Sequence, residues 1–189
     1  MSILEILGVS FAVSIDALAV SVGGALCSNE NRKIRNAVNA ALFFGIFQFF
    51  MPVCGYFCSS WIVRYTGKAA NFIGFALLAF VGIKMIVDAL KKESGSDNVC
   101  KVGMTDFFAP GNLVLPAIAT SIDALAVGAG FAFAGTQLWL PAASMGVVTA
   151  LVSGTAVLLG SSIKKLAGEK AMLICGGCVL IAIGVKMLF

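Results

Sequence analysis

Seven consecutive residues occur twice without change in this chain. Ser14–Val20 reads Ser-Ile-Asp-Ala-Leu-Ala-Val, and Ser121–Val127 repeats it. A second pair follows, Gly-Ile-Lys-Met at Gly82–Met85 and Gly-Val-Lys-Met at Gly184–Met187. Because the first motif opens each half and the second closes it, we expect one domain (1–189) made of two related units, 1–90 and 109–189, joined by a polar linker at 91–108.

The composition is that of a membrane protein. Hydrophobic residues make up 60% of the chain and charged residues 12%, with a mean hydropathy of +1.02. Soluble domains are about a quarter charged, and a span needs about 20 apolar residues. Such runs predict an all-α integral membrane fold with six transmembrane helices: Ile3–Cys27, Asn36–Val63, Lys68–Leu90, Pro110–Ala134, Leu138–Ile163 and Gly168–Phe189.

Each half contains three of these predicted helices. Since three is odd, the second half must enter the membrane upside down relative to the first. Inverted repeats are the plan of many secondary transporters, which bind their substrate near the bilayer midplane between the halves. We therefore expect two inverted three-helix repeats and a transporter rather than an enzyme, with no cofactor.

The basic residues predict the orientation. The first, third and fifth loops carry three each (Arg32, Lys33, Arg35; Lys91, Lys92, Lys101; Lys164, Lys165, Lys170), whereas the second carries Arg64 and Lys68 and the fourth none. Cytoplasmic loops are enriched in Lys and Arg. These three loops are therefore predicted to be cytoplasmic and both termini to lie outside. The net charge of +4 then sets topology and indicates no nucleic-acid partner.

One aspartate lies deep in the first helix of each half. Asp16 is about 21 Å along its helix, at ~1.5 Å per residue, and Asp123 is similarly deep. A charge there costs about 2.5–3.5 kcal/mol on insertion scales, and two carboxylates in low dielectric do not both stay ionised unaided. A divalent cation removes that conflict. We expect both acids to bind one metal ion, in competition with protons.

Two structural alternatives remain open for these acids. A buried Asp can cap a broken helix, or it can pair with a lysine such as Lys84 or Lys186. For the two lysines themselves, snorkelling to the lipid headgroups is the simpler interpretation.

Neutral oxygens near the two acids are further candidate ligands. Ser14 and Ser121 each precede an Asp by two residues, although hydroxyls within membrane helices more often bond their own backbone. Gln48 lies one turn before Pro52, whose ring frees a backbone carbonyl. Alignment through two glycines matches Gln48 to Thr149 in the second half. Histidine is absent, so a metal site here rests mainly on oxygen.

The cysteines allow a rival function. Cys54 and Cys58 are four residues apart, and Cys175-Gly-Gly-Cys178 forms a C-x-x-C. Such pairs can indicate a membrane thiol–disulfide oxidoreductase. Within an apolar helix, however, cysteine is usually a small hydrophobe, and the repeat preserves Asp rather than Cys. Packing is the favoured interpretation.

Taken together, these motifs resemble the bacterial manganese efflux pump family called MntP, which is related to the lysine-exporter superfamily. The likeness covers the whole chain and includes Ala119–Gly128 (A-T-S-I-D-A-L-A-V-G) and Phe44–Pro52 (F-G-x-x-[QE]-x-x-x-P). It implies an inner-membrane exporter whose substrate is Mn²⁺, with Asp16 and Asp123 matching the family's intramembrane acids. Some relatives have Glu in place of Gln48. Export of Cd²⁺ or of a basic amino acid is the alternative within transport, and no oligomeric state is predicted.

Overall fold

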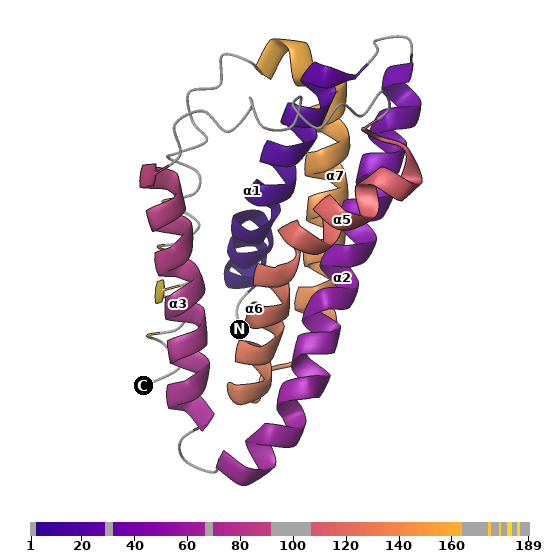
Figure 1. The fold of residues 1–189 in the computed structure, drawn as a ribbon. Coiled ribbons are helices and arrows are strands. Elements are labelled where there is room, and N and C mark those ends of the chain that lie inside the picture. Colours follow the sequence, from indigo (N-terminus) through magenta and orange to yellow (C-terminus); the bar gives the residue numbers. More distant parts are fainter. Residues whose placement is uncertain are drawn as a thin grey trace.

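The structure is a computed structural model that describes residues 3–28, 32–66, 70–91 and 107–163, with Ile174, Cys178, Ile181, Ala182 and Val185. Its described residues form helices and turns without a strand among them (Figure 1), which confirms the all-α prediction. The helices are α1 (Ile3–Cys27), α2 (Lys33–Thr66), α3 (Ala70–Lys91), α5 (Pro110–Thr120), α6 (Ile122–Phe133) and α7 (Trp139–Ile163).

Three of these helices are long and apolar enough to cross a membrane, over Ile3–Ala25, Lys33–Ile62 and Trp139–Leu159. The pair α5 and α6 makes a fourth span if it is counted as one bent unit. Within α3 the apolar stretch is shorter, Phe75–Lys84. The predicted sixth helix, Gly168–Phe189, lies mostly outside the described residues, so six spans and the inverted repeat stay predictions.

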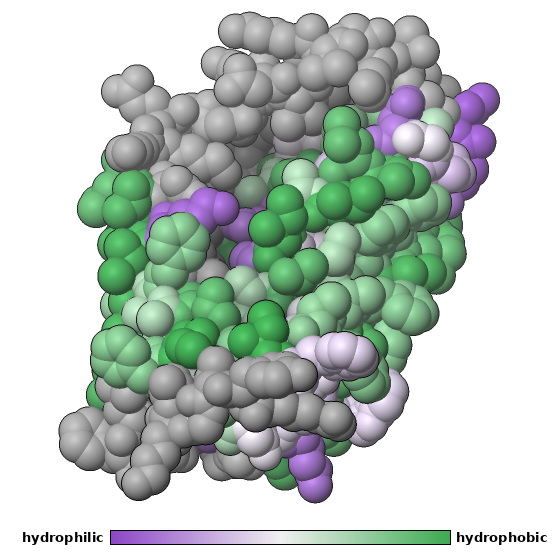
Figure 2. Space-filling model, turned by 60° about the horizontal axis from the view of Figure 1, so that its bottom comes forward, coloured by the Kyte–Doolittle hydropathy of each residue, from purple (hydrophilic) through white to green (hydrophobic). Residues whose placement is uncertain are grey.

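Large apolar side chains cover the outside of the helices. On α2 they recur every four residues with one gap of seven, and on α7 they include Val147, Leu151 and Leu158, each about half exposed or more. Figure 2 shows the same apolar surface across the middle of one face, with hydrophilic residues in a few small patches. Such a surface suits contact with lipid rather than water. The α2 set is Ile34, Val38, Leu42, Ile46, Phe50, Phe57 and Trp61.

The helices alternate in direction. In Figure 1, α1, α3 and α7 run upward, whereas α2 and the α5–α6 pair run downward. α7 packs along both α1 and α2, and α6 packs against α2 and α3. We call the upper end, which carries the connection from α1 to α2, the loop end. The lower end, with the turn at residues 134–138, is the turn end.

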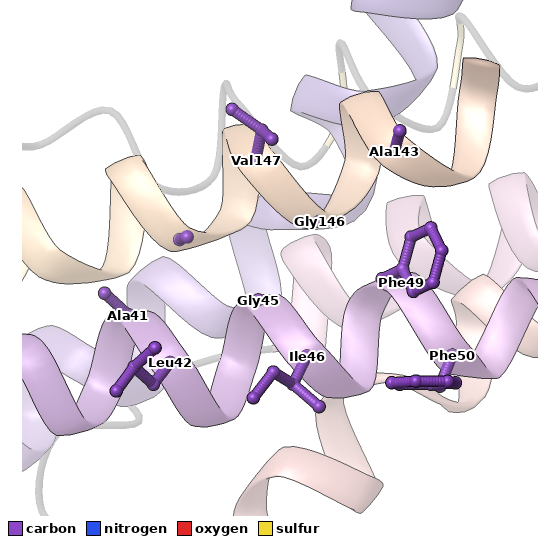
Figure 3. A pocket seen from close by; sticks show the side chains of 10 residues that line it. Ala41, Leu42, Gly45, Ile46, Phe49, Phe50, Ala143, Gly146 and Val147 are labelled. Carbon is purple, nitrogen blue, oxygen red and sulfur yellow. The ribbon is translucent and has the colours of Figure 1, made fainter. Parts of the chain in front are cut away.

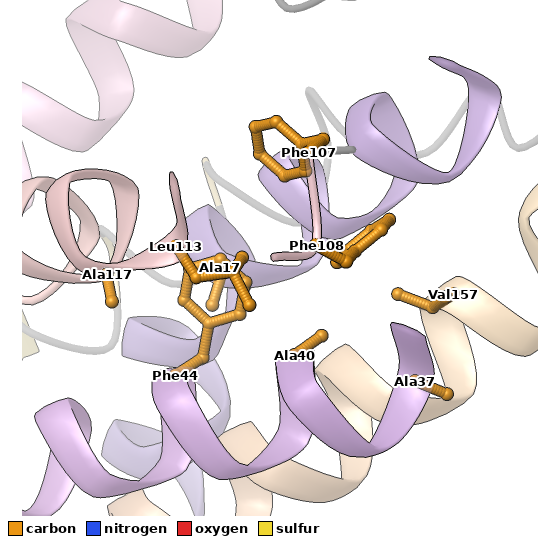
Figure 4. Close-up of a cluster of buried hydrophobic side chains, with 9 residues drawn as sticks. All are labelled: Ala17, Ala37, Ala40, Phe44, Phe107, Phe108, Leu113, Ala117 and Val157. Carbon is orange, nitrogen blue, oxygen red and sulfur yellow. The ribbon is translucent and has the colours of Figure 1, made fainter. Parts of the chain in front are cut away.

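Two buried apolar clusters fill the core, one towards each end. The loop-end cluster contains Ala17, Ala37, Ala40, Phe44, Phe107, Phe108, Leu113, Ala117 and Val157 (Figure 4). The turn-end cluster contains Val9, Val13, Ile15, Ala124, Val127, Phe131 and Met145.

On α2, α7 and the α5–α6 pair, buried polar residues follow one cluster and precede the other, and on α1 Ser14 lies at the inner edge of the turn-end cluster. The polar layer consists of Ser14 on α1, Gln48 on α2, Thr120 and Ser121 between α5 and α6, and Thr149 on α7. Because apolar side chains close it on both sides, the layer lies in the middle of the bundle. This is where the candidate site is assembled.

Candidate functional site

The fourth predicted span is broken within the polar layer. α5 ends at Thr120, α6 begins at Ile122, and the two axes differ by 44°. At Ser121 the backbone has φ −105° and ψ 3°, and its N–H donates to Ile118 O at 3.1 Å, a tighter pattern than the α-helix. The prediction of one helix over Pro110–Ala134 is therefore wrong at this point, because the sequence pattern did not reveal the break.

Side-chain chemistry before Ser121 explains the break. Pro116 has no N–H and cannot continue the helical hydrogen bonds. Thr120 Oγ1 lies 3.0 Å from Pro116 O and 3.2 Å from Ala117 O, and Ser121 Oγ donates to Ala117 O at 2.7 Å. Hydroxyls bonding to carbonyls one turn earlier tend to bend a helix. Together with the proline, they account for the bend.

The same seven residues form a continuous helix in α1. There the repeat positions of Pro116 and Thr120 are Val9 and Val13, which leave the backbone hydrogen bonds intact. Ser14 Oγ donates only to Phe11 O, at 2.8 Å. The break is thus determined by residues upstream of the shared motif and distinguishes the two copies.

Asp123 lies in the first turn of α6, immediately after the break. Its Oδ1 accepts a hydrogen bond of 2.8 Å from the N–H of Ala124, and the positive end of a helix dipole favours a carboxylate there. Its Oδ2 is buried and has no hydrogen-bond partner among the described residues. Leaving a buried carboxylate oxygen without a hydrogen bond costs free energy, so this atom is a candidate position for a cation or a proton.

Two other charged residues lie within electrostatic reach of Asp123. They are Asp16, its counterpart in the first repeat, and Lys84 on α3. Lys84 is fourteen residues after Ala70, about 21 Å along α3, well inside the helix. The site therefore combines two negative charges, and the exposed Lys84 side chain acts on them as a weaker positive charge. From the sequence, snorkelling to the lipid headgroups is the main role predicted for Lys84, and an influence on an aspartate is only the alternative. The signal for that influence is the Gly-x-Lys-Met motif, which recurs within apolar sequence.

Gln48 links the two copies of the motif across the polar layer. It is fully buried, its Nε2 donates to Val13 O at 3.3 Å, and its Oε1 accepts from Ser121 Oγ at 3.1 Å. Val13 directly precedes the first motif and Ser121 begins the second. Ser121 has one hydroxyl proton, which its bonds to Gln48 and Ala117 must share.

For the remaining predicted ligands, Ser14 and Thr149, the structure gives burial and hydrogen bonding within the polar layer. Ser14 is fully buried and bonds its own helix, as the simpler interpretation expects. Thr149 is also fully buried, and its Oγ1 has no hydrogen-bond partner among the described residues. Within these residues no three Asp, Glu, Cys or His side chains gather as a metal site. A cation held here would take two carboxylates and neutral oxygens.

Glycines allow the helix backbones to approach closely around this layer. A Cβ at Gly128 would collide with the backbone of Pro52, and one at Gly55 would collide with the backbone of Leu125. These two contacts fix the crossing of α2 and α6. At the crossing of α2 and α7, a Cβ at Gly45 would lie 3.1 Å from Gly146 O.

An open groove on the outside of this second crossing is not the candidate site. It runs between α2 and α7 (Figure 3), and its lining carries no polar side chain that could bind a cation. The lining residues are Ala41, Leu42, Gly45, Ile46, Phe49, Phe50, Ala143, Gly146, Val147 and Ala150.

Comparison with known proteins agrees with these features. Residues 31–188 match the family described as "Putative manganese efflux pump" (Mntp). The chain belongs to the MntP family. Relatives named "Putative manganese efflux pump MntP" occur in Campylobacter hominis (35% identity, 98% of this chain and 96% of the relative) and Oleidesulfovibrio alaskensis (37%, 97% and 94%). Another is found in Methanobrevibacter smithii (35%, 99% and 97%). No solved structure matches the chain.

MntP relatives are named as pumps, and therefore as transporters rather than enzymes. Three cysteines whose side chains the structure describes, Cys54, Cys58 and Cys178, are free and exposed. Cys54 and Cys58 are on the outside of α2, whereas Gln48 lies in its buried layer. This placement fits packing against lipid better than electron transfer through the core.

A cysteine-free chain tests the rival function. With all six cysteines replaced by alanine, we expect Mn²⁺ flux in proteoliposomes within about twofold of the native rate, since the cysteine side chains that the structure describes are exposed and surface substitutions change stability by only about 0.5 kcal/mol. The matched measurement is the reduction of a disulfide probe enclosed in the same vesicles. Loss of Mn²⁺ flux together with loss of probe reduction would instead support the oxidoreductase.

Proposed function

We propose that this protein is a secondary transporter that exports Mn²⁺ from the cytoplasm through a site centred on Asp16 and Asp123. The observation that carries the proposal is the buried Oδ2 of Asp123, which lacks a hydrogen-bond partner among the described residues and lies within electrostatic reach of Asp16. The site lies between the two apolar clusters, where a transporter of inverted-repeat design holds its substrate.

Charge balance gives the site two alternative states. A divalent cation neutralises both carboxylates, and it repels the Lys84 ammonium. After the cation leaves, two protons, one on each carboxylate, compensate the same negative charge, because an uncompensated buried charge is strongly unfavourable. Exchange of one Mn²⁺ for protons therefore follows from the chemistry of the two acids.

The ligand chemistry narrows the substrate to a hard divalent cation. Carboxylate, hydroxyl and amide oxygens suit Mn²⁺, Mg²⁺ and Ca²⁺. Asp16 and Asp123 supply the charge, and Thr149, Ser14, Ser121 and Gln48 are the neutral oxygens of the same layer. The names of the relatives favour Mn²⁺ among these ions.

The direction of transport rests on the orientation of the bundle. Arg32, Lys33 and Arg35 lie at the loop end, which the positive-inside rule assigns to the cytoplasm. Both termini then lie outside an inner (plasma) membrane that the chain crosses several times.

Metal flux in proteoliposomes tests this function. We expect Mn²⁺ to be transported faster than Mg²⁺ by about tenfold or more, in line with the higher affinity of oxygen and nitrogen sites for Mn²⁺ in the divalent series, and Cd²⁺ to be a weaker substrate. Equal rates for all three ions would refute the selectivity. Transport of lysine or arginine without metal would favour the amino-acid exporter instead.

The proposed exchange predicts a dependence on the proton gradient. Protons that enter while Mn²⁺ leaves make efflux faster when the outside is acidic, and one pH unit supplies about 1.4 kcal/mol per proton. Exchange of two protons for one Mn²⁺ moves no net charge, so a potassium diffusion potential set by valinomycin is expected to leave the rate unchanged. An efflux rate that follows the membrane potential and ignores the pH gradient would contradict this mechanism.

A further inference from the structure

Four buried side-chain oxygen atoms outside the aspartate pair have no hydrogen-bond partner among the described residues, three hydroxyls and one amide oxygen (Oδ1 of Asn36). They belong to Ser21 on α1, Asn36 on α2 and Thr149 and Ser153 on α7, each at most 2% exposed. Buried polar atoms are almost always hydrogen-bonded, and an exception calls for water or an ion as its partner. Four exceptions on three neighbouring helices indicate a shared cause.

The helix registers place these four groups at successive levels, starting with Thr149 in the polar layer and continuing towards the loop end. α1 and α7 run in the same direction and are joined where Ser10 Oγ and Ser144 Oγ lie 2.6 Å apart. Ser21 is eleven residues beyond Ser10, and Ser153 is nine beyond Ser144. At ~1.5 Å per residue, these two serines differ in level by only about 3 Å.

Asn36 continues the series at a higher level. A Cβ at Gly154 of α7 would lie 3.3 Å from Ala41 Cβ of α2, so these two residues share a level. Asn36 lies five residues from Ala41 towards the loop end, and Thr149 lies five residues from Gly154 in the opposite direction. The two are therefore separated by about 15 Å along the bundle, which is half of a hydrocarbon core of about 30 Å.

Each member of the series above Thr149 also lies one helical turn from a residue of the loop-end cluster. Ser21 follows Ala17, Asn36 precedes Ala40, and Ser153 precedes Val157, each by four residues; Figure 4 shows these three cluster members in one interhelical core. Residues four apart share a helix face. The polar groups are therefore directed towards the same core, beside the aromatic rings of Phe44 and Phe108.

In the half of the bundle towards the turn end, two neighbouring hydroxyls, those of Ser10 and Ser144, have hydrogen-bond partners within the protein. Ser10 bonds Ile6 O at 2.8 Å as well as Ser144, and Ser144 Oγ bonds Pro141 O at 2.8 Å. These hydroxyls are satisfied by the protein and need no water. The described core is therefore sealed towards the turn end, while towards the loop end it retains polar groups with unused hydrogen-bonding capacity.

We propose that Thr149, Ser153, Ser21 and Asn36 line a hydrated path along which a divalent cation reaches the aspartates from the loop end. Their oxygens hydrogen-bond water molecules of the ion's hydration shell, each water needing two to four polar partners, so that the cation loses its shell stepwise. The path gives the cytoplasmic half of the transporter its access, with the aromatic rings as its moving part. This inference rests on the proposed Mn²⁺ function.

Cysteine accessibility in the full-length, otherwise cysteine-free chain tests the path. The variants Ser153→Cys and Ser21→Cys are treated with a membrane-impermeant cationic methanethiosulfonate applied from the loop end. We expect both to react about tenfold faster than Ala156→Cys, a buried apolar neighbour, and Ser10→Cys, a bonded hydroxyl of the sealed half, because thiolate chemistry needs access to water. Saturating Mn²⁺ should slow the reaction at both path positions.

A second measurement does not depend on the cysteine variants. Ser153→Ala is expected to slow Mn²⁺ flux about tenfold while Mn²⁺ binding to the detergent-purified protein stays unchanged. Labelling of Ser153→Cys and Ser21→Cys no faster than that of the two controls, or native flux in Ser153→Ala, would overturn the path. The variants Asp16→Asn and Asp123→Asn, measured in the same vesicles, separate failure of the path from failure of the function. If the path results are negative and both aspartate variants abolish flux, only the path is wrong. If both aspartate variants retain flux, the proposed function itself is wrong.

Discussion

Replacing either Asp16 or Asp123 with asparagine is expected to lower Mn²⁺ flux by a factor of about a hundred to a thousand. Asparagine keeps the shape of the side chain and removes its charge. Removing one partner of a buried charge interaction costs about 3–5 kcal/mol, and each 1.4 kcal/mol is a factor of ten. The loss should be of similar size at both positions, because each contributes one of the two negative charges that balance the cation.

The controls for this prediction separate loss of charge from loss of fold. Glu5→Gln removes a carboxylate from the first turn of α1, far from the polar layer, and should leave flux unchanged. Asp123→Asn keeps an oxygen that can accept from the N–H of Ala124, so its thermal stability should stay close to native. Native flux in either aspartate variant, with native expression, would show that its carboxylate does not carry the ion.

The largest expected effect on stability comes from Gly128→Val. A Cβ at this position would meet the backbone of Pro52, which cannot move aside as a flexible side chain would. The helices α2 and α6 would have to separate at the level of the polar layer. We expect a loss of about 3 kcal/mol or more, at the upper end of the cost of overpacking, and a matching loss of monodisperse protein after extraction in detergent.

Gly111→Val is the matched control for that substitution. A Cβ at Gly111 has no neighbouring atom within 4 Å, so its effect should stay within about 0.5 kcal/mol. Thermal unfolding of both variants in the same detergent measures the difference. Equal melting temperatures for Gly128→Val and the native chain would mean that α2 and α6 do not cross as closely as described.

The ends of several helices were predictable because apolar runs stop at polar residues. α1 spans Ile3–Cys27 as predicted, and α7 begins one residue after the predicted Leu138. The break before α6 was not predictable from the shared motif, since the same seven residues are straight in α1. It depends on hydrogen bonds from the hydroxyls of Thr120 and Ser121 to the preceding carbonyls, next to Pro116, and the positions in α1 that correspond to Pro116 and Thr120 carry valines, Val9 and Val13.

The candidate site was predictable only in part. An acid repeated at matching depth in two apolar helices indicates Asp16 and Asp123, because burying a charge is unfavourable without a partner. Gln48 was predicted as an ion ligand, whereas its described bonds join Val13 and Ser121. That bridge, like the influence of Lys84 on Asp123, depends on how helices distant in sequence pack, and periodicity within one helix carries no such information.

Binding of Mn²⁺ to the purified chain, followed by electron paramagnetic resonance, most directly tests whether both aspartates hold the same ion. We expect one tightly bound Mn²⁺ per native chain, a loss of affinity of about a hundredfold in Asp16→Asn and in Asp123→Asn, and little further loss in the double variant, because side chains that share one ligand are not additive. If instead the losses multiply in the double variant, or either single variant binds as tightly as the native chain, the two carboxylates do not form one site.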